Sequence, residues 1–204
     1  MNAKNDANPM DRIRALLKDQ NGILFTSDLA KSGIPTTYLS LLVKKGELQR
    51  IYRGVYSAAN DTMVDEMASL QARYKRALFS HETALFLLGL TDRTPLFYSM
   101  TVPSRYNATP LKASGVKVYF VSSSLLPLGA LTVQSPHGND IKTFNLERTI
   151  CDVLRNRNQV DVQLVNEALK NYVIRKDRNI DQLYDFARQF RAQRIVREYI
   201  EVLL

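Results

Sequence analysis

The sequence predicts an α+β protein with an N-terminal winged helix-turn-helix domain and a larger mixed α/β C-terminal domain, which carries a small sheet and C-terminal helices. Three observations support this prediction. Helical patterns fill residues 9–45, an aromatic and β-branched run occupies residues 47–57, and helical and strand-like segments follow a polar stretch at residues 58–62. The polar stretch is typical of a boundary, so we expect domains at residues 1–60 and 61–204.

The bulk composition indicates a globular protein of the cytoplasm. Apolar residues supply 45% of the 204 residues and charged residues 24%, which is enough apolar material for a buried core. No apolar run approaches the roughly 18 residues of a membrane span, and the first residues lack the pattern of a secretory signal. The one cysteine, Cys151, has no disulfide partner within the chain. We therefore expect no membrane partner and a reducing compartment.

The charge balance favours polyanionic partners, above all nucleic acid. The formal net charge is +8 and the pI is about 9.6. Residues 1–60 hold nine Lys or Arg against five Asp or Glu, and residues 61–204 hold nineteen against fifteen, so the excess is denser in the first domain. A basic soluble protein without a nucleic-acid partner has a similar composition, so charge alone does not decide the function.

The first 45 residues have the spacing of a helix-turn-helix. A first helix is predicted over residues 9–20, where apolar residues recur at helical spacing. Thr26 and Ser27 can cap a brief second helix that ends at Gly33. The third helix is predicted over residues 36–45, so the turn before it is short and contains glycine, as this motif requires.

The third helix combines an apolar face with a polar and basic one. At about 100° per residue, one arc of roughly 100° is polar. This arc comprises Thr36, Thr37, Ser40 and Lys44. The remaining arc, expected to face the core, comprises Tyr38, Leu39, Leu41, Leu42 and Val43, with Lys45 among them. Short hydroxyl side chains can contact base edges or phosphates and lysine neutralises phosphate, so we expect a recognition helix in the major groove.

The run at residues 47–57 predicts a two-stranded hairpin that would serve as the wing. Arg50 and Arg53 lie at or near its tip, from which long cationic side chains can contact phosphates or the minor groove. A single surface arginine is more often only solvated, and the order of helices followed by a basic hairpin is the more specific signal. The predicted DNA-binding residues are Thr36, Thr37, Ser40, Lys44, Lys45, Arg50 and Arg53.

Beyond residue 60 the pattern predicts helices outside a short sheet. Expected helices are 63–79, 81–88 (capped by Ser80), 146–154 (capped by Asn145) and the remainder from 160, with interruptions near 175–179 and 192–193. Expected strands are 96–102, 116–122, 131–134 and 141–144.

Four arginines recur every three residues near the C-terminus and predict a slowly spiralling basic stripe along the last helix. They are Arg188, Arg191, Arg194 and Arg197. Glu198 and Glu201 lie close by in sequence, so one interpretation is a solvated helix face. The other is a second surface for nucleic acid or an acidic partner.

The residue types that usually carry catalysis are sparse, and we expect no enzyme, no metal and no cofactor. His81 and His137 are the two histidines, and neither lies in a metal-binding pair. Cys151 lies among apolar residues on a predicted helix, which is typical of a buried thiol. Phosphate-binding glycine motifs are missing. The fragment from Asp140 to Lys142 could end a metal-nuclease motif, but a turn entering an edge strand explains it more simply.

Three segments resemble one known family. They are GIPTTYLSLLVKKGELQRIYRGVY at residues 33–56, SHETALFLLGL at residues 80–90 and Thr101–Val102–Pro103. Together they resemble the AbiEi antitoxins of type IV toxin-antitoxin systems. The most specific pieces are the helix-to-hairpin run that ends in Arg-Gly-Val-Tyr and the Ser-His-Glu-Thr-Ala segment.

The resemblance implies a bacterial protein whose winged module binds inverted repeats in double-stranded DNA upstream of its own operon and represses it. It further implies that the C-terminal domain serves antitoxicity against a nucleotidyltransferase toxin, without a stable complex, in abortive infection against phage. No short motif assigns antitoxin residues in that domain. Two alternatives remain: a stand-alone winged-helix repressor whose C-terminal domain senses a ligand or dimerises, and a nucleic-acid-processing enzyme that uses Asp140 and Lys142.

Overall fold

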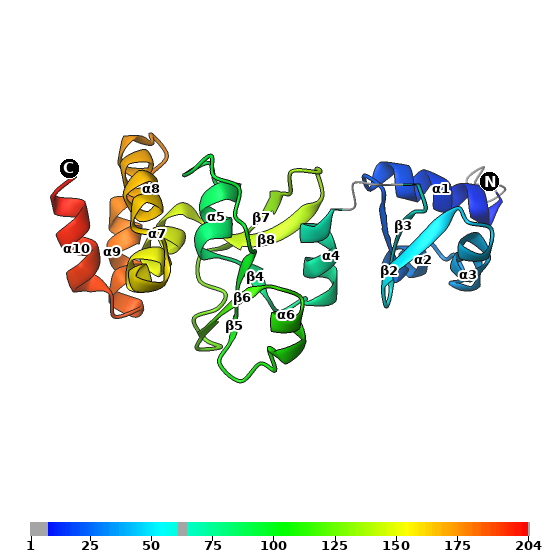
Figure 1. The fold of residues 1–204 in the computed structure, drawn as a ribbon, viewed down its shortest axis with the longest axis horizontal. Helices are drawn as coiled ribbons and strands as arrows, with labels where there is room; N and C mark the ends of the chain where they lie inside the picture. The colour runs from blue at the N-terminus through cyan, green and yellow to red at the C-terminus, as the bar shows by residue number, and fades with distance from the viewer. Residues whose placement is uncertain (1–7, 61–64, 204) are drawn as a thin grey trace, which may run out of the picture. The chain divides into compact units, whose positions relative to one another are not determined.

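The computed structural model describes residues 8–60 and 65–203, and it is a mixed α/β structure with small sheets and C-terminal helices (Figure 1). The chain forms two compact units. The first contains the described residues up to Lys75 together with Gln134–Ile141, and the second contains Arg76–Val133 and the chain from Lys142. The predicted boundary at residues 60 and 61 therefore lies within the first unit, and residues 61–64 lie outside the described residues.

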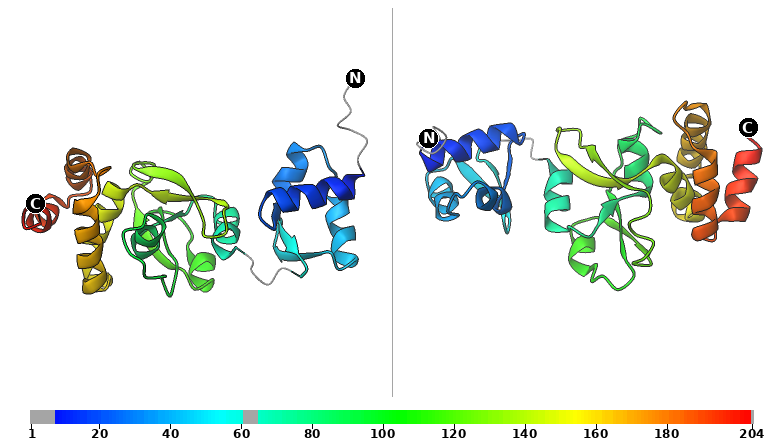
Figure 2. Two further views of the ribbon diagram at one scale, coloured as in Figure 1. Left: turned by 90° about the horizontal axis from the view of Figure 1, so that it is seen from above. Right: turned by 180° about the vertical axis from the view of Figure 1, so that it is seen from behind.

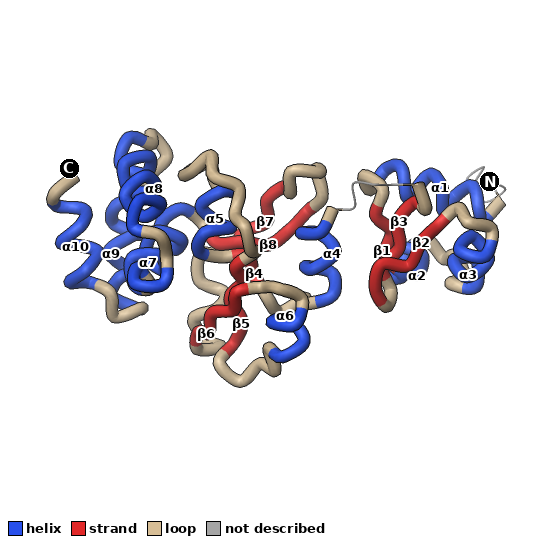
Figure 3. The backbone as a smooth tube through the Cα atoms, in the orientation of Figure 1, coloured by secondary structure: helices blue, strands red, loops and turns tan. Residues whose placement is uncertain are grey.

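The first unit begins with three helices around a small antiparallel sheet (Figure 3). The helices are α1 (Pro9–Asp19), α2 (Thr26–Lys31) and α3 (Thr37–Lys44). The strands are β1 (Ile23–Phe25), β2 (Leu48–Tyr52) and β3 (Val55–Ala58), in the order β1-β3-β2. Apolar side chains from all three helices and from the first two strands form one core, which comprises Ile13, Leu24, Leu29, Ile34, Leu39, Leu42 and Leu48.

Local signals explain where these helices begin and end. The side chain of Asn8 accepts a hydrogen bond from the Met10 amide, and Pro9 occupies the first turn of α1. Between α2 and α3 the chain turns at residues 32–36, and the Ile34 amide donates to the Leu29 carbonyl at 2.8 Å. Ile34 is buried in the core, so this turn fixes how the two helices pack.

Helix α4 (Glu66–Arg73) is shorter than predicted. The prediction of one helix over residues 63–79 is wrong, because the helix ends at Tyr74 and residues 78 and 79 pair with another strand instead. Met63, its predicted start, lies outside the described residues. Asp65 caps α4 by accepting from the Ala68 amide at 2.9 Å, and it also accepts from the Asn139 amide group at 2.9 Å and the Ser135 hydroxyl.

The second unit contains a three-stranded mixed sheet in the order β4-β5-β6 (Figure 2). Its strands are β4 (Leu78–Phe79), β5 (Ser99–Pro103) and β6 (Lys117–Val121), with α5 (His81–Leu87) after β4 and α6 (Thr109–Ala113) between β5 and β6. Strand β4 is antiparallel to β5, and β5 is parallel to β6. The predicted strand at residues 96–102 begins later, because Leu96 and Phe97 are exposed loop residues.

A separate hairpin and a group of helices complete the chain. The hairpin pairs β7 (Ala130–Gln134) with β8 (Asp140–Phe144). The helices are α7 (Leu146–Arg155), α8 (Val162–Ile174), α9 (Ile180–Gln189) and α10 (Gln193–Glu201), with a 3₁₀ turn η1 (Arg157–Gln159) after α7. The interruptions predicted near residues 175–179 and 192–193 are confirmed. Within the described ranges, no helix is both long and apolar enough to cross a membrane.

Helix α7 is the centre of the second unit. The side chain of Asn145 accepts from the Arg148 amide at 3.0 Å and caps the helix, as predicted. Residues 146–154 are all buried, because α5, α8, α9 and α10 each contact α7. Its neighbours place Tyr172, Leu183 and Val196 in one core with Ile150.

Candidate nucleic-acid interface

Helix α3 presents a polar and basic face to solvent. Thr36, Thr37, Ser40, Lys44 and Lys45 are all exposed, whereas Leu39 and Leu42 are buried in the core of the first unit. The Thr36 hydroxyl makes no capping hydrogen bond within the described chain, although Thr36 occupies the capping position. The Thr36 hydroxyl is therefore available to a ligand.

The apolar side of α3 is narrower than the sequence predicts. Leu41 is 39% exposed and Val43 is 37% exposed, so the expectation that both face the core is wrong. The reason is geometric, because α3 packs against α1 and β2 and these two elements leave Leu41 and Val43 partly uncovered. At about 100° per residue, Leu41 lies only about 40° around the helix from Thr37. Leu41 therefore belongs to the exposed face.

The hairpin of β2 and β3 ends in a two-residue turn. Tyr52 pairs with Val55, which leaves Arg53 and Gly54 as the turn itself, and Gly54 has a φ of +83°. Glycine adopts such a φ without the strain that a Cβ would cause. Arg53 is exposed at this turn. Arg50 lies further back in β2, opposite Tyr56, so Arg53 alone is at the tip.

Helix α2 and helix α4 hold the hairpin turn in place. The Thr26 amide donates to the Gly54 carbonyl at 3.0 Å, and a Cβ on Gly54 would lie 3.0 Å from the Thr26 hydroxyl oxygen. From α4, the Arg73 guanidinium lies 4.8 Å from the centre of the Tyr52 ring, within the range of a cation–π contact. The turn is thus supported on both flanks.

A hollow of about 280 Å³ lies beside the turn and adds a cation that the sequence analysis missed. Arg53 and Lys75 both line it, together with Thr26, Ser27 and the acidic Asp140. Lys75 is exposed and comes just after α4, where no local pattern connects it with the hairpin. Only the packing of α4 against β2 and β3 places it there.

All four predicted DNA-binding cations lack an acidic partner among the described residues. Lys44, Lys45, Arg50 and Arg53 form no ion pair with any described residue. The nearby Arg14 differs, since its guanidinium lies 2.8 Å from the Glu47 carboxylate. Lys45 contacts the sulfur of Met10 in α1 at 3.7 Å, so its side chain extends away from the polar face of α3.

Comparison with known proteins finds a family model that matches the helices and the hairpin of the first unit. Residues 11–59 match the family model described as "Transcriptional regulator, AbiEi antitoxin". These residues are called the AbiEi segment below. The AbiEi segment includes nearly all of α1 and every element from β1 to β3, and the match supports a DNA-binding antitoxin.

The fold as a whole is similar to a solved structure, the crystal structure of the RV2827C protein from Mycobacterium tuberculosis. The sequence identity is 15%, the TM-score is 0.64, and the match covers 95% of this chain and 76% of that chain. At this identity the likeness concerns the fold. A comparison with curated proteins found no match.

Outside the AbiEi segment, the four C-terminal arginines do not form the stripe that the sequence predicts. Arg188 lies on α9, Arg191 has a φ of +55° in the turn after it, and Arg194 and Arg197 lie on α10. The prediction of a single helix face is wrong because the chain reverses at Arg191. Two of the four are also paired: Arg188 with Asp185 at 2.7 Å and Arg197 with Glu201 at 3.6 Å.

The other candidate residues for chemistry also lie beyond the AbiEi segment. Cys151 is buried, and burial raises the pKa of its thiol to about 12, so the reactive thiolate is scarce near neutral pH. Asp140 and Lys142 are both exposed on β8, and Asp140 accepts a hydrogen bond from Gln134. Among the described residues, no three His, Cys, Asp or Glu side chains gather as a metal site.

Proposed function

We propose that this chain is an autoregulating antitoxin whose first unit binds double-stranded DNA, with α3 in the major groove and the β2–β3 hairpin as a wing. The observation that carries the proposal is the exposed face of α3 in the AbiEi segment, where Thr37, Ser40 and Lys44 lie together without an acidic partner. Eight residues give α3 a length of about 12 Å, comparable with the width of the major groove.

Different parts of this surface would contact different parts of DNA. Hydroxyl groups of Thr37 and Ser40 can bond to base edges, which differ between base pairs and so carry sequence information. Lys44 and Arg53 can neutralise phosphates, which gives affinity without discrimination between sequences. Arg50, which is exposed behind the tip, would add a further phosphate contact.

The DNA part of the proposal is tested with the duplex that lies upstream of the chain's own gene. Fluorescence anisotropy with the full chain should show tighter binding to that duplex than to a shuffled sequence of equal length, and the preference should depend on an inverted repeat. In a reporter strain the same sequence should be repressed. Equal affinity for both duplexes at every salt concentration would contradict operator recognition.

The proposal extends to the partner of the antitoxin. The match of residues 11–59 to the family model supports a toxin partner in general. We infer a nucleotidyltransferase toxin that the chain opposes in phage abortive infection without a stable complex. Co-expression of the full chain with a neighbouring nucleotidyltransferase gene should restore growth. Loss of DNA binding through Lys44→Ala with Arg53→Ala should leave this rescue intact. Failure of the unmodified chain to rescue would favour a stand-alone repressor, and co-elution of the two proteins would contradict the absence of a stable complex.

The proposal assigns no catalytic step to the chain. Purified protein incubated with Mg²⁺ or Mn²⁺ and labelled nucleic acid should leave the nucleic acid intact. Cleavage that disappears in Asp140→Asn would instead support the nuclease alternative.

A further inference from the structure

A polar cavity of about 200 Å³ lies within the second unit. The side chains that matter for its chemistry come from α5, β6, α7 and η1, and they are His81, Tyr119, Arg148, Asp152, Arg155 and Gln159. Pockets that bind small ligands place a few convergent polar groups around such a space. None of these residues lies in the segment that matches the AbiEi family model.

His81 forms a rigid wall of the cavity. It is buried, its φ is +49° although it is not a glycine, and its ring stacks on Tyr119 with 3.4 Å between the ring centres and 9° between the planes. Backbone conformations of this kind persist where surrounding contacts impose them, and they concentrate at functional sites. The cavity wall is therefore held in one geometry before any ligand arrives.

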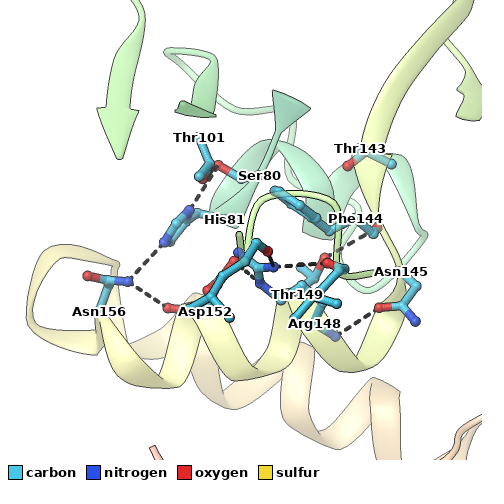
Figure 4. Close-up of polar contacts among 12 residues, drawn as sticks. Ser80, His81, Thr101, Thr143, Phe144, Asn145, Arg148, Thr149, Asp152 and Asn156 are labelled. Carbon is cyan, nitrogen blue, oxygen red and sulfur yellow. Dashed lines mark hydrogen bonds and ion pairs between the residues drawn. The ribbon is translucent and has the colours of Figure 1, made fainter. Parts of the chain in front are cut away.

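The hydrogen bonds of His81 show that its ring is neutral and which nitrogen carries the proton (Figure 4). The Asn156 amide nitrogen donates to the Asp152 carbonyl at 3.0 Å, which establishes the orientation of that amide. The same nitrogen lies 3.1 Å from Nε2 of His81, so Nε2 accepts. Nδ1 must then carry the proton and donate to the Ser80 hydroxyl at 3.0 Å. Burial lowers the pKa of His81 well below its usual value, in agreement with a neutral ring.

This arrangement makes His81 a poor base for Ser80. A base that activates a serine needs a free nitrogen lone pair directed at the hydroxyl, and here the proton of Nδ1 already points to it. The pair therefore organises the wall of the cavity and does not form a nucleophile.

Arg148 supplies a buried positive group with one donor nitrogen unused. Its side chain is fully buried, with Nε donating to Asp152 at 2.8 Å and Nη1 donating to the carbonyls of Leu125 and Leu128. The guanidinium carbon lies 4.3 Å from the centre of the Phe144 ring and 3.8 Å from the centre of the Phe190 ring. Nη2 has no hydrogen-bond partner within the described part of the chain. A buried donor without a partner is costly, and it calls for a specific explanation.

Arg155 adds a second positive group at the open side of the same cavity. It lies on α7 two turns after Arg148, is exposed, and forms no ion pair with a described residue. The one carboxylate that lines the cavity, Asp152, is already bonded to Arg148. The lining therefore carries two guanidinium groups against one carboxylate, and its net charge favours an anion.

We propose that this cavity binds a small oxyanion, the phosphate or carboxylate group of a small-molecule ligand. Guanidinium groups match the oxygens of phosphates and carboxylates in both charge and planar geometry, which point charges do not. Arg148 and Arg155 hold the oxyanion, the Gln159 side chain is within the lining as a neutral donor, and the His81–Tyr119 stack closes the cavity behind it. This site is independent of the DNA-binding proposal.

Amide NMR spectra of the full chain test the site with two probes, inorganic phosphate and acetate, each titrated against chloride at constant ionic strength and pH. The signals of residues 155–159 and of His81 should shift saturably with one or both probes. The probe that binds more tightly shows whether the anionic group of the ligand is a phosphate or a carboxylate. Arg155→Gln, a change of an exposed side chain, should weaken the apparent affinity by about tenfold or more, because a charged hydrogen bond is lost.

Arg157→Gln is the matched control, since Arg157 lies two residues away on η1 and does not line the cavity. Its affinity for either anion should equal that of the unmodified chain. The proposal is overturned if neither probe causes saturable shifts at these signals. It is also overturned if Arg155→Gln and Arg157→Gln weaken binding equally, because that would indicate a general effect of surface charge.

Discussion

On α3 and the β2–β3 turn, some residues should give affinity for DNA and others should give sequence specificity. Lys44 and Arg53 have no acidic partner among the described residues. On binding DNA they would exchange contacts with water for contacts with phosphates. Thr37, Ser40 and Leu41 share the same exposed face and would meet base edges. Because phosphate contacts release counterions and base contacts do not, salt dependence distinguishes the two groups.

Changing Lys44 or Arg53 to alanine should weaken binding to every DNA sequence alike. Each change should also flatten the dependence of log K on log salt by about one unit, because one phosphate contact is lost. The measurement is anisotropy over a range of salt concentrations, with Lys18→Ala as the control, since Lys18 is exposed on α1. An unchanged slope would remove the residue from the interface.

Leu41 should contact the methyl group of a thymine in the operator. Leu41 is 39% exposed beside Thr37, which is unfavourable for an apolar side chain in water. In the major groove it can contact the thymine methyl, which is the apolar group that base pairs present there. Replacing thymines one by one with deoxyuridine should cost about 1 kcal/mol at one position. The cost should vanish in Leu41→Ala.

Val43→Ala is the matched control for Leu41→Ala in this experiment with deoxyuridine. Val43 is 37% exposed but lies about 160° around the helix from Leu41, given about 100° per residue. Val43→Ala should therefore keep the deoxyuridine effect. If the effect survives in Leu41→Ala as well, Leu41 does not read the methyl group.

His81 should make the second unit less stable in mild acid. Burial first, and then the charges of Lys117, Arg148 and Arg155, lower the pKa of His81 below the usual 6.5. The unfolded chain binds a proton below pH 6.5 and the folded chain does not, so the stability present above pH 6.5 is lost as the pH falls. The limiting slope is about 1.4 kcal/mol per pH unit.

Denaturant unfolding between neutral and mildly acidic pH measures this slope. His81→Gln should flatten it, whereas His137→Gln, which changes an exposed histidine, should leave it unchanged. Equal slopes in both variants would show that other groups govern the acid response.

Elements formed by local signals could be predicted from the sequence, and those formed by distant pairing could not. Helices α1, α3 and α7 have periodic apolar positions, and α1 and α7 also have capping side chains, so each lies where expected. Strand β4 is the opposite case. Its two residues continue a helical pattern, and only the pairing with β5, twenty residues later in the chain, makes them a strand.

The turn before β7 depends on a glycine for both conformation and space. Gly129 has a φ of +72°, and a Cβ there would lie 2.8 Å from atoms of both Arg148 and Asn145. Gly129→Ala should therefore destabilise the chain by the positive-φ strain of about 1–2 kcal/mol and by about 1–3 kcal/mol more from overpacking.

Gly115→Ala should show the strain alone, so the difference between the two variants measures the overpacking. Gly115 has a φ of +77° but no atom within 4 Å of the added Cβ, so it carries the strain without the clash. The free energy of unfolding of both variants provides the comparison. Equal losses would mean that the structure around Arg148 yields to the extra atom.

At the scale of the whole molecule, the first unit is assembled from segments far apart in sequence. Asp65 is 2% exposed and bonds to its own helix α4 and to Ser135 and Asn139, which follow seventy or more residues later. This carboxylate therefore joins α4 to the tip of the β7–β8 hairpin. A boundary drawn at residue 60 would separate both from the AbiEi segment, with which they form one unit.

Asp65→Ala should release this connection. It removes a helix cap and leaves the buried Ser135 hydroxyl and the half-buried Asn139 amide without their partner, at a total cost of about 2–4 kcal/mol. Hydrogen exchange of the α4 amides measures the local loss. Asp161→Ala is the control, because Asp161 caps α8 from an exposed position and should cost only about 1 kcal/mol. Equal effects would show that Asp65 acts as a cap alone.

The sequence by itself determined the helix-turn-helix, the polar face of α3 and the exposed cation at the hairpin turn, because periodicity, capping and turn chemistry act over a few neighbouring residues. It overestimated the apolar side of α3, since only packing decides how much of a helix is covered. Tertiary structure alone brought Lys75 beside Arg53, Asn156 to His81 and Asp65 to Asn139. Such pairs are about twenty to seventy-five residues apart in sequence. Side-chain contacts at that separation produce no periodic pattern from which they could be predicted.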